Sequence, residues 1–356
     1  MSDVSVFMRS TRGLTVPILR LSWTWRLLKK RMLVSALSIA FIFFGPIAGF
    51  AQETRIRAAY SAISGSMAWV WAAQEAGYFD RHGLKVDLVY IGGSAQLFQS
   101  LLAGEIAFGI GGGPSIINAN IQRTSIVGIA GTLNRMIMKI MAPPQIKSPA
   151  DVRGKRIAIT RYGTITDFSA RLFLKKWGLS AEKDAAILQV GSIPNVLAAL
   201  QSGTTQIGVL SPPAHFQAEK LGFSELMDLS KEEIYYPYTY VAVSAGFLDK
   251  NKNLIPPFLT AAVEGIHRFK SDRAFAKKVM AKYLRIDDDK LLEQTHQLFS
   301  NLFERTPYIK REGLASLAQI LAEKEPKIEA LNLDSVVEDR FVRELETSGF
   351  IRNLYR

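Results

Sequence analysis

The sequence predicts an α/β fold made of two similar domains, with a helical segment at its C-terminal end. From Arg55 onward, short apolar runs of strand length alternate with helical patterns, which is typical of βαβ units and mostly parallel sheets. A glycine and proline pattern occurs twice, and the two copies lie 99 positions apart. Beyond Pro257 the pattern is almost wholly helical. Amphipathic helices need an apolar face to cover, so we expect this segment to pack on one domain.

The expected strands are short apolar runs bounded by turn residues. They are Arg55–Ser61, Leu84–Ile91, Ile106–Ile110, Ser125–Thr132, Arg156–Thr160, Ala186–Val190, Gln206–Leu210, Glu225–Asp228 and Tyr238–Ser244. Helices are expected in the intervals, at Met67–Ala76, Ala95–Ala103, Ser115–Gln122, Thr166–Trp177, Ile193–Gln201 and Ala214–Leu221.

Composition excludes several kinds of site. The 356-residue chain is 48% hydrophobic, which is enough for two domains with cores of ordinary size. It has no cysteine, and this excludes disulfides, thiolate metal sites and thiol nucleophiles. The four histidines show no metal-ligand spacing. We therefore expect neither a metal site nor a cofactor.

Residues 1–51 have the layout of a secretory signal peptide. The basic residues Arg26 and Lys29–Arg31 precede the apolar run Met32–Phe44, and small residues follow it. A membrane span needs roughly 20 apolar residues, which is more than this run provides. We expect cleavage and a periplasmic protein without a lipid anchor. An uncleaved anchor is the alternative, and a start at Met8 or at Met32 is also open.

Removal of this segment changes the charge of the chain. The net charge of the whole sequence is +12, and residues 1–51 hold seven Lys or Arg and one Asp, so +6 remains. No basic stripe interleaved with aromatic residues is present. The sequence therefore does not predict nucleic-acid binding.

The run Gly109–Pro114 is half of the internal repeat. Gly104, Gly109 and Pro114 recur as Gly203, Gly208 and Pro213. The run lacks the lysine of a phosphate-binding loop and the spacing of a dinucleotide fingerprint. It remains a strand-to-helix turn, and such turns can offer backbone N–H groups to an anionic or polar ligand. We expect the two turns to come from opposite domains and to face each other across a cleft. The alternative is that the similarity does not come from a duplication, because βαβ proteins commonly have glycines and prolines at such turns.

Hydroxyl residues and glycines recur at the ends of the expected strands. If the strands are parallel, these ends converge on one crevice, although each residue alone could be a helix N-cap. Arg161 is the best-placed cation for a carboxylate or sulfonate, although a solvated loop position explains it equally well. The expected ligand-binding residues are Ser61, Ser64, Ser66, Trp69, Gly93, Ser94, Gly112, Gly113, Pro114, Arg161, Tyr162, Thr164, Ser211, Pro212 and Tyr236.

Four segments together resemble a known family. Gly77–Leu88, Leu102–Ile106, Ile146–Ala158 and Ala198–Gly203 are similar to segments of the SsuA/THI5-like (NMT1-type) solute-binding proteins of ABC transporters. The resemblance implies a type II periplasmic binding protein fold, in which two α/β lobes close on a ligand in the cleft between them. It also implies a discontinuous first lobe, residues 52–140 and 239–356, around a second lobe, residues 141–238.

The implied function is solute capture for an ABC permease in the inner membrane. The solute would be small and anionic or aromatic and polar, such as a sulfonate, nitrate, a carboxylate or a pyrimidine-like compound, and the protein would be a monomer. No nucleophile–base arrangement or acidic pair is legible, so we do not expect an enzyme. A secreted enzyme on the same fold and a ligand-sensing partner of a membrane receptor are the alternatives.

The chain departs from the family pattern in two ways. Ala107 and Gln206 stand where the family often has aspartate, which leaves the role of those aspartates open here. The enzymatic THI5 branch has a cysteine-rich motif, which a chain without cysteine cannot contain.

Overall fold

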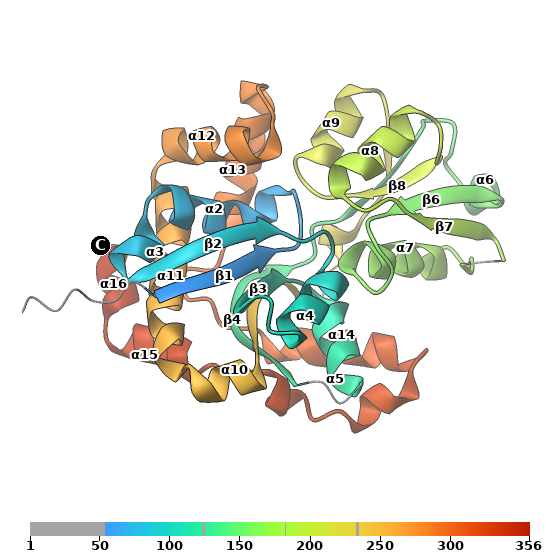
Figure 1. Ribbon diagram of the computed structural model, residues 1–356. Helices are drawn as coiled ribbons and strands as arrows, with labels where there is room; N and C mark the ends of the chain where they lie inside the picture. The colour runs from blue at the N-terminus through green and yellow to red at the C-terminus, as the bar shows by residue number, and fades with distance from the viewer. Residues whose placement is uncertain (1–53, 123–124, 182, 233–234) are drawn as a thin grey trace, which may run out of the picture. The chain divides into compact units, whose positions relative to one another are not determined.

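Two five-stranded sheets form the framework of the protein (Figure 1). The computed structural model describes residues 54–122, 125–181, 183–232 and 235–356, so the expected signal peptide, residues 1–51, lies outside the described residues. The strands are β1 Thr54–Tyr60, β2 Leu84–Tyr90, β3 Phe108–Gly111, β4 Ile126–Arg135, β5 Lys139–Ala142, β6 Lys155–Ile159, β7 Ala185–Gln189, β8 Ile207–Leu210, β9 Ser224–Asp228 and β10 Tyr235–Ser244. The strand order is β2-β1-β3-β10-β4 in the first sheet and β7-β6-β8-β5-β9 in the second.

Helices follow most strands and cover the sheets. They are α2 Ala68–Glu75, α3 Tyr78–Arg81, α4 Ser94–Leu102, α5 Pro114–Ile121, α6 Pro149–Val152, α7 Ile165–Lys176, α8 Ile193–Gln201, α9 Ala214–Lys220, α10 Ala245–Lys250, α11 Ile255–Ser271, α12 Arg273–Leu284, α13 Asp289–Leu302, α14 Arg311–Ala322, α15 Arg340–Thr347 and α16 Phe350–Leu354, with a 3₁₀ turn, η1, at Gly65–Met67. We call each sheet with the helices packed on it a lobe. None of the helices in the described ranges is long and apolar enough to span a membrane.

The expected elements are present, and their ends agree within about three residues. The expectation of mostly parallel sheets was wrong. In each sheet two strand pairings are parallel and two are antiparallel. The antiparallel pairings all involve β5 or β10, the strands that follow a crossing from the other sheet. The sequence analysis missed β5, Lys139–Ala142, because only three apolar residues and no glycine or proline separate it from β4.

The 99-residue repeat extends through both lobes. Helices α4 and α8 begin and end at positions that differ by 99 residues, and so do strands β3 and β8. Gly104 and Gly203 both follow a helix with positive φ, 76° and 71°, a conformation that favours glycine. The two sheets therefore have the same strand order, with β10 in the first sheet at the place that β5 takes in the second.

The lobes exchange one strand each. Strand β5 follows β4 of the first sheet but joins the second, and β10 follows β9 of the second sheet but joins the first. The chain therefore crosses between the lobes twice. The expected lobe boundaries, after residues 140 and 238, fall inside β5 and β10. If each strand is assigned to one lobe as a whole, the boundaries lie just before Lys139 and Tyr235.

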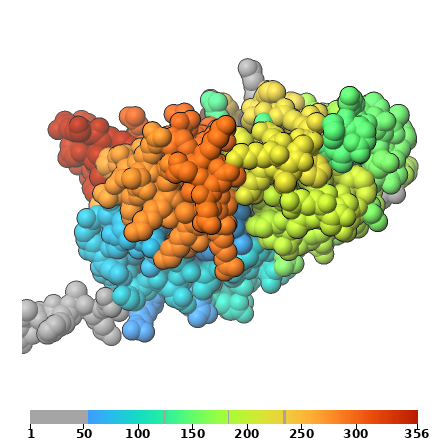
Figure 2. Space-filling model, turned by 90° about the horizontal axis from the view of Figure 1, so that it is seen from above, coloured from blue at the N-terminus to red at the C-terminus, as the bar shows by residue number. Residues whose placement is uncertain are grey.

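The C-terminal helices pack on the first lobe. Helix α11 lies against α2 so closely that a Cβ on Gly265 would stand 2.5 Å from the carbonyl oxygen of Trp69. The chain after α13 reaches the sheet edge, where Gly131 N donates to Pro307 O at 2.7 Å. Seen from above, the orange surface of the α12–α13 region lies beside the yellow-green surface of the second lobe (Figure 2). Lys220 of α9 forms an ion pair with Asp288, the N-cap of α13, at this contact.

Candidate functional site

A small cavity lies where the carboxyl ends of the parallel strands of both lobes meet. Its volume is about 40 Å³, which is room for roughly three water molecules. Loops from both sheets contribute to its wall, together with Met138, which lies between β4 and β5, and Tyr238 of β10. The lining residues are Ser61, Ala62, Ser66, Met67, Tyr90, Gly93, Ser94, Gly112, Met138, Thr160, Thr164, Ile165, Thr166, Ser192, Ile193, Ser211 and Tyr238.

The cavity wall is rich in hydroxyl groups. Ten of the seventeen lining residues are Ser, Thr or Tyr, and none of them is Asp, Glu, Lys, Arg or His. A hydroxyl group can both donate and accept a hydrogen bond, so this wall can bind polar groups without a countercharge. The chemistry that the wall offers is recognition by hydrogen bonding.

Three threonines of the second lobe form part of the wall. The Thr160, Thr164 and Thr166 Oγ1 atoms lie within 2.8–3.3 Å of one another. The Thr166 Oγ1 atom also accepts from the Thr160 backbone N–H at 3.0 Å, and the Thr164 hydroxyl donates to Arg161 O at 2.7 Å. These bonds hold the hydroxyl groups in position at the start of α7.

Three helices begin at the cavity. Gly93 and Ser94 start α4, Thr164 and Ile165 start α7, and Ser192 and Ile193 start α8, and all six residues line the wall. The N-terminal turn of a helix carries unpaired N–H groups and partial positive charge, and therefore favours anions. Since α4 comes from the first lobe and α7 and α8 from the second, a bound anion would interact favourably with both lobes.

A buried serine cluster joins the lobes at the edge of the cavity. The Ser64 hydroxyl donates to Pro212 O at 3.1 Å and accepts from the Ser211 hydroxyl at 2.9 Å. The Ser66 hydroxyl lies 3.3 Å from the Ser64 Oγ atom, and Gly65 N donates to Pro212 O at 3.1 Å. Ser64 therefore connects the β1–η1 loop to the β8–α9 loop.

Arg161 crosses from the second lobe to the first. Its Nε–H donates to Gly92 O at 2.7 Å, and a Cβ added at Gly93 would stand 2.9 Å from its Cδ. No carboxylate is paired with Arg161 among the described residues. Its guanidinium thus lies beside two cavity residues, Tyr90 and Gly93, and its positive charge can pair with a bound anion.

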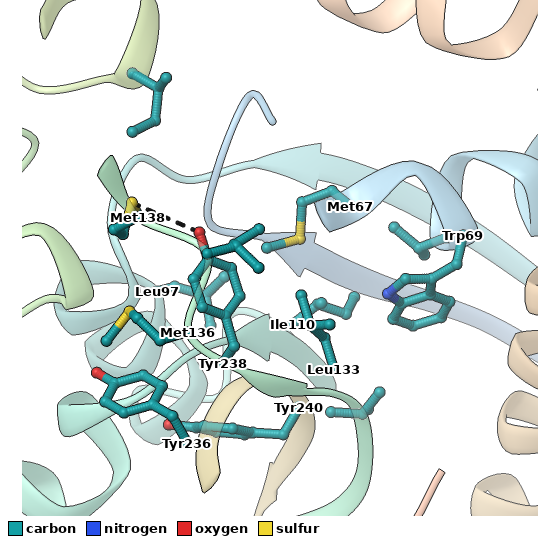
Figure 3. Close-up of a cluster of buried hydrophobic side chains, with 14 of the residues drawn as sticks. Met67, Trp69, Leu97, Ile110, Leu133, Met136, Met138, Tyr236, Tyr238 and Tyr240 are labelled. Atoms are coloured by element: carbon teal, nitrogen blue, oxygen red, sulfur yellow. Dashed lines mark hydrogen bonds between the residues drawn. The ribbon is translucent and has the colours of Figure 1, made fainter. Parts of the chain in front are cut away.

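Tyr238 of β10 forms part of the cavity wall, and Tyr236 and Tyr240 of the same strand lie in the buried cluster beside it (Figure 3). The Tyr238 hydroxyl contacts Met138 Sδ at 3.7 Å, and burial raises the pKa of Tyr238, so its phenol stays neutral. The Tyr240 hydroxyl accepts from Ile116 N at 3.1 Å. The Tyr236 hydroxyl has no hydrogen-bond partner among the described residues, and burial raises the pKa of this side chain as well.

Seven of the expected ligand-binding residues line this cavity: Ser61, Ser66, Gly93, Ser94, Gly112, Thr164 and Ser211. Four others, Ser64, Gly113, Arg161 and Pro212, are next to lining residues in the chain or contact them. Pro114 lines a different cavity.

Three expected residues lie elsewhere. Trp69 is fully buried in the core of the first lobe. Tyr162 is 47% exposed and donates to Ile187 O at 2.6 Å. Tyr236 packs against Phe168, with ring centroids 5.3 Å apart. We leave these three out of the proposed site.

The expected role of the glycine turn needs a correction. The Gly112 N–H donates to the Ser94 hydroxyl at 2.9 Å, and the Gly113 N–H donates to Pro237 O at 2.8 Å. Both amides already have acceptors within the protein. The turn therefore shapes the wall, and Gly112 and its repeat-related residue Ser211 contribute to the same cavity.

The sequence analysis did not commit to Tyr90, Thr160, Thr166, Ser192 and Tyr238. Three of them could have been found from the sequence, because Thr160 and Thr166 are the first and last residues of the turn that contains the expected residues Arg161, Tyr162 and Thr164, and Ser192 follows Gly93 by 99 positions. Tyr238 and Met138 reach the cavity only through the strand exchange, which no local pattern indicates.

The two departures from the family pattern lie away from the cavity. Ala107 and Gln206 precede β3 and β8, at the strand ends opposite to the cavity. The Gln206 side chain accepts from Arg156 N at 3.2 Å and donates to Gly203 O at 3.1 Å. This side chain has a structural role at a strand start. The described residues contain no group of three acidic or histidine side chains that could hold a metal ion.

Comparison with family models places the chain. The model described as NMT1/THI5 like matches residues 65–272. The chain belongs to this family. Among curated relatives, a protein of Brucella abortus (strain 2308) named as a binding protein is 32% identical over 159 residues, 43% of this chain. The aligned part is about half, 47%, of that relative. The binding protein YtlA of Bacillus subtilis (strain 168) is 22% identical over 62% of this chain and 68% of its own length.

Solved structures share the fold of this family member. A protein from Bordetella bronchiseptica RB50 superposes with a TM-score of 0.75 at 18% identity, over 83% of this chain and 98% of its own. The alkanesulfonate-binding protein SsuA of Xanthomonas axonopodis pv. citri, bound to MOPS, superposes with a TM-score of 0.66 at 15% identity, over 80% of this chain and 98% of its own. The nitrate-binding protein NrtA of Synechocystis PCC 6803 superposes with a TM-score of 0.68 at 13% identity, over 83% of this chain and 89% of its own. The protein has the periplasmic binding protein fold.

Proposed function

We propose that this protein is the periplasmic solute-binding component of an ABC importer and captures a small polar anion between its lobes. The observation that carries the proposal is the cavity itself, whose hydroxyl-rich wall is supplied by both lobes. Family membership and the names of its structural neighbours, which bind a sulfonate buffer or nitrate, support the same class of function. A permease in the inner membrane is the proposed partner.

The wall favours an anion for four reasons. The N-terminal turns of α4, α7 and α8 provide partial positive charge. The Ser94 hydroxyl and the hydroxyl pair of Thr160 and Thr166 can donate hydrogen bonds to oxyanion oxygens, whereas the Thr164 hydroxyl already donates to Arg161 O. Arg161 supplies a full positive charge at the rim, where it already joins the lobes. No acidic side chain lines the cavity to repel an anion.

The protein performs no chemistry in this proposal. The cavity wall contains no His, Lys, Asp or Glu that could act as a general base for its serines. Its volume of about 40 Å³ is smaller than a sulfonate or carboxylate solute needs. The lobes must therefore move apart to admit the solute, and contacts to both lobes would favour closure around it.

Calorimetry and thermal shift test this proposal. Nitrate, short alkanesulfonates, carboxylates and pyrimidines are titrated into the mature chain, and we expect one class to bind and to raise the melting temperature. Ser94→Ala should weaken binding of that anion about tenfold, because a hydrogen bond to a charged group is worth about 1.5–3 kcal/mol. Ser348→Ala is the matched control, since Ser348 is exposed and donates to Leu345 O.

Two results would count against the proposal. One is that no anion in the panel stabilises the protein. The other is that a solute carried through purification is recovered as a reaction product, since mass analysis of that solute separates a binding protein from an enzyme.

A further inference from the structure

A second and larger cavity lies between the lobes, outside the site described above. Its volume is about 190 Å³, and its wall comes from α5 and α14 of the first lobe and from α7 of the second. Only Thr164 belongs to both cavities. Because the wall includes side chains from both lobes, the cavity has this form only when the lobes have this arrangement.

The inside of this cavity is apolar. Pro114 and Phe168 are buried, whereas Leu172, Ile320 and Leu321 are only partly buried, so their side chains remain in contact with water. Transfer of such surface from water is favourable by about 25 cal/mol per Å². An apolar cavity of about 150 Å³ is known to admit benzene. This cavity is therefore large enough for one aromatic ring or a short branched chain.

The rim of the cavity is charged, with an excess of positive charge. Lys175 of the second lobe pairs with Glu323 of the first at 2.8 Å, and Asp167 accepts from Arg171 Nε at 2.8 Å. Lys324 has no acidic partner among the described residues. The rim thus has three cations and two carboxylates, and Lys324 can pair with a carboxylate on a ligand.

We propose that this cavity binds a small aromatic or branched aliphatic carboxylate, whose apolar part lies between α5, α7 and α14 and whose carboxylate pairs with Lys324. The ligand is an effector distinct from the solute. It holds the lobes in the closed arrangement, because it contacts α7 on one side and α5 and α14 on the other.

Coupling to the first site follows from this geometry. A ligand that binds only the closed arrangement and a solute that favours closure raise each other's affinity by the same factor. This coupling rests on the proposed function, whereas the existence of the second site does not. The two parts can therefore fail separately.

The test uses 4-fluorobenzoate as the probe and follows it by ¹⁹F NMR with the mature chain. We expect binding with a dissociation constant on the order of 1 mM or below, as suits a ligand of about ten heavy atoms. Leu172→Trp fills the cavity and should weaken binding at least tenfold, and Ile320→Trp on the opposite wall should do the same. Lys324→Gln should weaken binding about threefold to tenfold. Lys327→Gln is the matched control, because Lys327 is exposed and does not line the cavity.

A further variant distinguishes the two cavities. Ser94→Ala removes a hydroxyl from the first cavity without filling it, so the lobes can still close, and it should leave binding of the probe unchanged. The second site is refuted if the wild-type chain does not bind the probe at 10 mM, or if Ser94→Ala removes binding while folded Leu172→Trp and Ile320→Trp variants retain it. Once a solute is known, the probe should tighten its binding about fivefold in the wild type and not in Leu172→Trp. Equal solute affinity with and without bound probe would refute the effector role alone.

Discussion

Removal of the Ser64 hydroxyl should weaken closure of the lobes without unfolding either one. Ser64→Ala deletes the bond to Pro212 O and the bond from the Ser211 hydroxyl, which both join the lobes. Ser64 does not line the cavity, so it acts by positioning the β1–η1 loop against the β8–α9 loop. In an open form of the protein, water replaces both partners.

The magnitude follows from the number of bonds lost. A neutral hydrogen bond contributes about 0.5–1.5 kcal/mol net, so two bonds give about 1–3 kcal/mol. The lower half of that range applies here, because Pro212 O keeps its bond from Gly65 N and the Ser211 hydroxyl keeps Tyr238 as a neighbour. A loss of about 1–2 kcal/mol raises the dissociation constant of the solute roughly fivefold to thirtyfold.

Calorimetry of solute binding measures this change, and small-angle scattering of the free protein reports how far the lobes open. Ser169→Ala is the matched control, because Ser169 is equally buried but donates to Ile165 O within α7 at 2.7 Å. Ser169→Ala should lower the melting temperature and leave affinity unchanged. If Ser64→Ala binds the solute within twofold of wild type, the serine cluster does not hold the lobes together.

Three further predictions concern single positions. Gly208→Ala places a Cβ 2.7 Å from a leucine side chain of α8, so chemical denaturation should show a loss of about 1–3 kcal/mol, whereas Gly246→Ala meets no atom within 4 Å and should cost less than about 1 kcal/mol. Gly93→Ala strains a residue at φ +86° and displaces Arg161, so calorimetry should show weaker solute binding and scattering a more open protein. Burial lowers the pKa of His215 to about 3. Between about pH 6.5 and pH 3 this histidine is therefore protonated in the unfolded state and neutral in the folded state. The free energy of unfolding should fall by up to about 1.4 kcal/mol for each pH unit as the pH drops through this range. His215→Gln should flatten this decline, and an unchanged slope would contradict the neutral buried state.

The repeat made most of the fold predictable from the sequence. In each lobe a glycine with positive φ ends a helix, and an apolar strand follows it. Gly104 and Gly203 therefore marked the helix end and the strand start at corresponding positions of the two lobes. The helices and strands between these glycines agree with the prediction because a βαβ unit consists of elements that are consecutive in the chain. The directions of β5 and β10 were missed because they depend on two crossings between sheets, and such a crossing leaves no local pattern.

The candidate site was predictable where it follows from strand ends and not where it depends on packing. Serines and threonines after β1, β6 and β8 reach the cavity because the carboxyl ends of parallel strands meet at one edge of a sheet. Trp69 was assigned to the site because it follows such a turn. It is one helical turn farther along, on the face of α2 that α11 covers, so it belongs to the core.

The strand exchange also indicates how the lobes can move. Each sheet contains one strand that the chain reaches by crossing from the other sheet, so two crossings join the lobes, and rotation about them is the motion that this connection favours. Only Met136, Ile137 and Met138 connect β4 to β5, and all three are buried. Met138 and Tyr238 also line the first cavity, where the Tyr238 hydroxyl contacts the Met138 thioether. A thioether is polarisable and flexible, so this contact can persist through a change of angle. Met138 therefore belongs both to a segment that joins the lobes and to the cavity wall, so a solute that touches it would contact the connection between the lobes as well as the lobes themselves.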